Sequence, residues 1–68
     1  MENRVTGFVQ SFNRHAGYGF VLAMGSEDPV YFRAEDVEGG GQALSEGQQV
    51  SFVLVLGEGR FEAKEIRP

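Results

Sequence analysis

Glycine-containing turns divide the chain into short runs rich in valine, phenylalanine and tyrosine, and no stretch shows a sustained helical period. Residues of these types favour strands, and short strands bounded by turn signals every 8–12 residues or so are typical of small barrels and sandwiches. The pattern predicts five strands, over residues 5–12, 18–22, 30–33, 49–56 and 61–66. The sequence therefore favours an all-β fold.

The length of the chain narrows the choice of all-β fold. Sixty-eight residues without a cysteine allow one small domain, over residues 1–68, which relies on a compact core. Closing the sheet removes its exposed edges, so we expect a five-stranded antiparallel barrel. Its interior is expected to hold Val5, Val9, Val21, Val30, Phe32, Val50, Phe52 and Leu54. In the last strand, Phe61, Ala63 and Ile66 are expected to pack against the strand before it.

The segment between the third and fourth predicted strands differs from the rest of the chain. Residues 34–49 form one long connection, mostly irregular, with a single helical turn expected near residues 34–37. Six basic and ten acidic residues give the chain a net charge of −4, and residues 27–58 alone carry −6 (seven acids against one arginine). Nucleic acid is attracted by positive charge, so any such contact is expected to avoid residues 35–46 and to use the first third of the chain.

Five of the eight aromatic residues lie between positions 12 and 32. Because alternate residues of a strand share a face, Tyr18 and Phe20 lie on the face opposite Gly19. Gly19 leaves the inner side of its strand nearly without side chain, and the aliphatic residues suffice to fill the interior. We therefore expect Tyr18, Phe20 and Tyr31 on the outside, with Phe12 at the hairpin end of the same strip. The competing interpretation, in which these aromatics fill the core, stays open at this point.

An exposed aromatic strip on a small domain indicates a binding surface. Flat rings next to cationic side chains suit the stacking of unpaired bases. The candidate contacts are the four rings of the strip, the neighbouring arginines, and two polar residues close to them: Phe12, Tyr18, Phe20, Tyr31, Arg33, Arg14, Gln10 and His15.

Four segments carry a resemblance to a known family: VTGFVQSFN at residues 5–13, GYGFV at 17–21, VYFR at 30–33 and GQQVSF at 47–52. In order and spacing they resemble the bacterial cold shock proteins over nearly the whole chain, with one residue fewer in the 38–43 loop. GYGFV is similar to the first ribonucleoprotein motif of that family, and VYFR to the second. The resemblance implies a five-stranded antiparallel oligonucleotide-binding fold (OB-fold) that binds single-stranded RNA or DNA on the aromatics of its second and third strands.

The chain departs from the family pattern at several binding positions. Gln10 and Ser11 stand where the family usually has Lys and Trp, and Ala16 stands where it has Lys. Arg33 and Ala34 replace a His and a Phe. Each lost stacking contact removes about 1–3 kcal/mol. The resemblance therefore implies weak binding, which Arg33 offsets in part by stacking on bases and pairing with phosphate.

Other kinds of site find little support in the sequence. His15 is the only histidine and has no Cys or acidic partner at metal-ligand spacing. Glu35, Asp36 and Glu38 lack the ligand pattern of a calcium loop. No serine–histidine–acid arrangement is evident, and no apolar run is long enough to span a bilayer. We expect no metal, no cofactor, no membrane contact and no enzymatic activity.

The sequence therefore predicts a cytoplasmic RNA chaperone-like protein that binds single-stranded RNA or DNA weakly and with low specificity. The alternative is a cold-shock-like barrel that has lost this affinity and serves as a protein-interaction module. In that case the aromatic strip would contact a partner protein or a second copy of the chain. The net charge and the missing Lys and Trp residues motivate this alternative.

Overall fold

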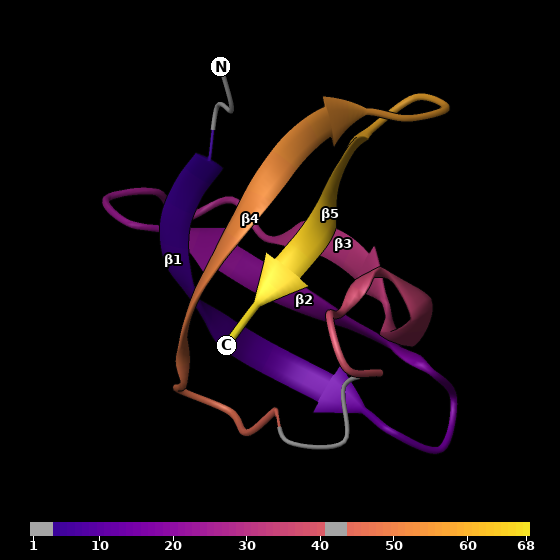
Figure 1. Ribbon diagram of the computed structural model, residues 1–68. Helices are drawn as coiled ribbons and strands as arrows, with labels where there is room; N and C mark the ends of the chain where they lie inside the picture. The colour runs from indigo at the N-terminus through magenta and orange to yellow at the C-terminus, as the bar shows by residue number, and fades with distance from the viewer. Residues whose placement is uncertain (1–3, 41–43) are drawn as a thin grey trace.

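A computed structural model describes residues 4–40 and 44–68 of the chain (Figure 1). These ranges contain five strands and one short 3₁₀ helix: β1 (Arg4–Asn13), β2 (Tyr18–Ala23), β3 (Val30–Arg33), η1 (Ala34–Asp36), β4 (Gln49–Leu56) and β5 (Phe61–Arg67). The five predicted strands are confirmed, with ends that differ by one residue at most. The helical turn predicted near residues 34–37 is confirmed as η1. No helix in the described ranges is long and apolar enough to cross a membrane.

The strands form a closed barrel in the order β1-β2-β3-β5-β4, in which β4 pairs with β1 to complete the ring (Figure 1). Neighbouring strands are antiparallel except β3 and β5, which run parallel where Tyr31 lies opposite Glu62. The five-stranded barrel is confirmed, but the expectation that it is purely antiparallel is wrong. The long connection after β3 leads to a β4 that pairs with β1, so β5 returns beside β3 in the same direction as β3.

The core consists of the buried residues Val9, Val21, Val30, Phe32, Val37, Leu44, Val50, Phe52, Ala63 and Ile66. Six of the eight predicted core residues are among them. Val5 is only partly buried, and the prediction for Leu54 is wrong, because its side chain is 39% exposed. Leu54 lies just past Val53, where the pairing of β4 with the described part of β1 ends. Val37 and Leu44 were not predicted, and both come from the long connection after β3.

Two register shifts change which side chains face the core. One lies in the middle of β1, over residues 9–11, and the other in β5 near Glu65, whose φ is +51°. An extra residue in one strand of a pair reverses the inward and outward alternation beyond it. This explains how Ala63 and Ile66, three positions apart, are both buried as predicted. Phe61 lies against β4 as predicted, opposite Leu56, but its side chain is 55% exposed and is not part of the core.

Candidate nucleic-acid interface

Three aromatic side chains form one cluster on the outside of the barrel, where β2 pairs with β3. Phe20 lies opposite Tyr31 in the register, and Tyr18 lies two residues before Phe20 on the same face. The ring centroids are 5.9 Å apart for Tyr18 and Tyr31, 6.0 Å for Phe20 and Tyr31, and 6.3 Å for Tyr18 and Phe20. Tyr18 is 40% exposed, and the other two side chains are partly exposed. We call Tyr18, Phe20 and Tyr31 the ring cluster.

Close packing beneath Gly19 fixes the outward direction of this part of β2. Gly19 is buried, and a Cβ atom there would lie 2.3 Å from the carbonyl oxygen of Ser11 and 2.9 Å from the ring of Phe32. No side chain fits on the inner side of the strand at this position. Alternation then places Tyr18 and Phe20 on the outer side, as the sequence predicts.

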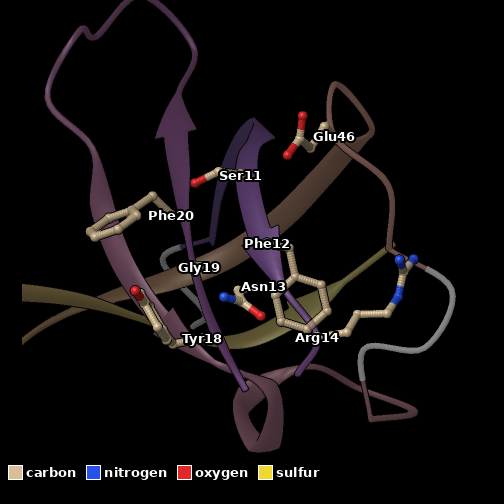
Figure 2. Close-up of a pocket in the computed structure, with 8 residues that line it drawn as sticks. All are labelled: Ser11, Phe12, Asn13, Arg14, Tyr18, Gly19, Phe20 and Glu46. Carbon is tan, nitrogen blue, oxygen red and sulfur yellow. The ribbon is translucent and has the colours of Figure 1, made fainter. Parts of the chain in front are cut away.

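Phe12 lies differently from the prediction. Its ring stacks on the buried ring of Phe32, with centroids 5.4 Å apart and an angle of 29° between the planes, and it packs against the core. The extra residue in β1 precedes Phe12 and turns its side chain toward the interior. Phe12 still borders a hollow that Tyr18 and Phe20 border from the other side (Figure 2). It is therefore a wall of this hollow rather than a fourth member of the ring cluster.

Two guanidinium groups lie next to the ring of Tyr31. The Cζ atom of Arg33 is 5.7 Å from the ring centroid, and that of Arg60 is 4.0 Å from it. The pKa of Arg33 is raised by its side-chain hydrogen bond with Tyr31 and then by the charges of Tyr31 and Glu62. Arg60 was missed at the sequence level, because only the parallel pairing of β3 with β5 brings the β4–β5 turn to the ring cluster. Both cations therefore border the ring cluster on the β3–β5 side.

The other polar candidates lie outside the ring cluster. Arg14 donates a hydrogen bond to the backbone carbonyl of Leu44, and its Cζ is 5.9 Å from the ring centroid of Phe12. Figure 2 shows its guanidinium extended away from the ring cluster, so Arg14 fastens the β1–β2 turn to the long connection. Gln10, within β1, and His15, in the turn after β1, are both exposed.

Basic side chains of β5 engage the acidic segment that follows β3. The Nζ atom of Lys64 is 3.3 Å from Oδ2 of Asp36 and 3.4 Å from Oε1 of Glu62. Arg67 donates from Nε to Oε2 of Glu38 at 3.0 Å. The pKa of Lys64 is raised, chiefly by its hydrogen bond with Asp36. These pairs offset part of the negative charge that the sequence places after β3.

Glu46 belongs to the 35–46 segment, which the sequence predicts to stay out of nucleic-acid contact, yet it lies close to the ring cluster. It is exposed, and it lines the same hollow as Phe12 and Phe20 (Figure 2). No local signal identifies it, because its place depends on how the long connection packs against β1. In the part of the chain that the structure describes, no group of three or more His, Cys, Asp or Glu residues is arranged to hold a metal ion.

Comparison with protein families matches residues 5–68 to the 'Cold-shock' DNA-binding domain. The chain belongs to this family. It is 40% identical over 68 residues to the cold shock protein CapB of Pseudomonas syringae pv. tomato, an alignment that covers 98% of this chain and 97% of CapB. It is 41% identical over 69 residues to the major cold shock protein CspA of Pseudomonas aeruginosa, with the same coverage.

The solved structures include a cold shock domain with the same fold. The Drosophila protein described as Unr CSD456 superimposes with a TM-score of 0.80 over 97% of this chain and 26% of that one, at 23% sequence identity. This likeness confirms the fold. Together with family membership, the open ring cluster identifies the chain as a nucleic-acid-binding domain of the cold shock type.

Proposed function

We propose that the chain acts in the cytoplasm as one domain over residues 1–68, which binds single-stranded RNA or DNA and keeps it unpaired without turnover chemistry. The ring cluster carries this proposal: three rings lie within 6.3 Å of one another on the outside of the barrel, beside two arginines. Unpaired bases stack on such rings with little sequence preference, and each contributes about 1–3 kcal/mol.

The orientations of the rings suit a strand that turns as it crosses the sheet. Tyr18 and Tyr31 are stacked at 26°, whereas Phe20 is nearly perpendicular to Tyr18, at 86°, and inclined at 70° to Tyr31. Successive bases can thus meet ring faces that point in different directions. Arg33 and Arg60 are placed to pair with the phosphates between those bases or to stack on them.

Binding by this surface is weak. The net charge of −4 opposes a polyanion, and Gln10 and Ser11 supply neither the cation nor the indole that the family usually has there. With few cations near the rings, we also expect a shallow dependence of affinity on salt.

A titration of fluorescently labelled oligo-dT and oligo-U at low salt tests the proposal. We expect saturable binding that Phe20→Ala weakens by about 5- to 150-fold, the equivalent of one lost stacking contact. Phe61→Ala is the matched control, because Phe61 is an exposed ring at the start of β5, opposite Leu56, and is not a member of the ring cluster. Binding that is absent at millimolar protein, or that falls equally in both variants, would overturn the proposal.

The alternative function as a protein-interaction module has no support in the comparisons. A pull-down with and without nuclease distinguishes it from nucleic-acid binding. The proposal predicts that co-purifying partners are lost on nuclease treatment, and partners that resist nuclease would favour the alternative.

A further inference from the structure

A hollow of about 450 Å³ lies beside the ring cluster, above the backbone of β2. Figure 2 shows Tyr18 and Phe20 on one side of it and Phe12 on the other, with Ser11 and Glu46 toward one end. Its volume falls in the range of small-ligand sites, roughly 300–1,000 Å³. Aromatic walls with polar groups around them form a suitable site for one unpaired base, which stacks through its faces and hydrogen-bonds through its edges.

The turn that carries Glu46 is held firmly against β1. The N–H of Gly47 donates to the carbonyl of Val9 at 2.7 Å, and the N–H of Val9 donates to the carbonyl of Gln48 at 2.9 Å. Within the turn, the N–H of Ser45 donates to Oε1 of Gln48 at 3.0 Å, and the N–H of Gln48 donates to the carbonyl of Ser45 at 3.1 Å. The backbone of Glu46 is thus fixed before any ligand binds, which lowers the entropic cost of using its carboxylate.

Asn13 supplies a hydrogen-bond donor to the same hollow. Its Oδ1 accepts a hydrogen bond from the N–H of Ala16 at 2.9 Å, and this bond fixes the orientation of the amide. The Nδ2 group is then the end that faces outward, and Figure 2 shows it turned toward the side of Tyr18 and Phe20. The hollow therefore contains an amide donor and, at Glu46, an exposed carboxylate acceptor.

These groups distinguish the bases by the polarity of their edges. Guanine presents N1–H and an N2 amine side by side, next to its O6 acceptor, and a carboxylate accepts from two adjacent donors at once. Thymine and uracil present a single N3–H between two carbonyl oxygens, which repel a carboxylate. We propose that the hollow selects an unpaired guanine, whose N1–H and N2 amine donate to Glu46 and whose O6 accepts from Asn13. This inference rests on the proposed function and makes Glu46 a specificity-determining residue.

The test uses a short oligo-dT and two derivatives whose central base is guanine or hypoxanthine, which lacks the 2-amino group. We expect the guanine oligonucleotide to bind about tenfold more tightly than oligo-dT, as one bidentate contact to a base allows, with hypoxanthine between them. Glu46→Gln and Asn13→Asp should each abolish the preference; the aspartate keeps the acceptor for Ala16 and removes the amide donor. Glu27→Gln is the control, because it removes the same charge from an exposed residue outside the hollow and should keep the preference.

The possible results of this titration distinguish a failure of the guanine site from a failure of the proposed function. Equal binding of all three oligonucleotides, with Phe20→Ala still weakening every complex, overturns the guanine site and leaves the proposed function intact. A guanine preference that survives Glu46→Gln also overturns it. Binding of none of the oligonucleotides overturns both proposals. Urea denaturation of Glu46→Gln and Asn13→Asp shows whether each variant keeps the fold.

Discussion

Gly19 is the residue on which the outward direction of the ring cluster depends most directly. A methyl group there would meet the carbonyl oxygen of Ser11 at 2.3 Å and the Cα of Phe12 at 2.9 Å, and no side-chain rotation moves either backbone atom. We expect Gly19→Ala to lower the free energy of unfolding by about 2–3 kcal/mol through overpacking, measured by urea denaturation. Gly59→Ala is the control: its φ is +77° and its Cβ meets open space, so it should cost only about 1 kcal/mol of backbone strain. Equal losses would argue against tight packing beneath Gly19.

Residue positions that depend on local alternation could be predicted from the sequence. The outward placement of Tyr18 and Phe20 follows from the glycine between them and from the strand period of two. The inward turn of Phe12 could not be predicted, because a bulge leaves no clear mark in a run such as VTGFVQSFN. Arg60 and Glu46 depend on pairings between segments far apart in the chain, which alternation does not reveal.

At the scale of elements, features that depend on local sequence could also be predicted, whereas features that depend on contacts between distant segments could not. All five strands could be predicted, because valine-rich and aromatic runs between glycine turns are local signals. Val37 and Leu44 are single apolar residues in an acidic, glycine-rich connection, so no periodicity marks them as core. Leu54 continues the apolar alternation of β4 past the point where the described part of β1 pairs with it, and its side chain is 39% exposed although the pattern predicts burial.

The contact between β5 and η1 should make the stability of the fold depend on pH. The raised pKa of Lys64 means that its pairs with Asp36 and Glu62 stabilise the fold fully below the ordinary lysine pKa of 10.5. That stability is lost as the pH rises through the raised pKa. We expect Lys64→Met to be less stable than the native chain by about 0.5–1 kcal/mol near neutral pH, and the difference should shrink well above pH 10.5.

Urea denaturation of both chains across this pH range gives the measurement. Arg67→Met is the matched control, because Arg67 pairs with Glu38 at 3.0 Å through a guanidinium, a type of group that keeps its charge in proteins even at alkaline pH. The loss of stability in Arg67→Met should persist at the alkaline pH where the loss in Lys64→Met disappears. A difference for Lys64→Met that stays constant through alkaline pH would show that the side chain acts by packing rather than by charge.

At the scale of the whole molecule, the closed barrel determines which charged side chains lie next to one another. A net charge of −4 suggests a poor partner for nucleic acid, but the barrel sets Lys64 and Arg67 on β5 against the acids after β3. It also brings Arg33 of β3 and Arg60 of the β4–β5 turn to the ring cluster. The order and spacing of four motifs sufficed to predict the barrel, whereas the charge distribution on its surface required the strand order.

This arrangement sets the salt dependence of binding. Each phosphate contact with a single strand contributes a slope of about −0.7 to a plot of log K against log salt concentration. Contacts by Arg33 and Arg60 alone therefore predict a slope near −1.4, and Arg60→Gln should reduce it to about −0.7. Arg67→Gln removes the same charge from a residue that is engaged with Glu38, and it should leave the slope unchanged. A native slope steeper than about −3, measured by oligonucleotide titration over a salt series, would require cations that the ring cluster does not provide.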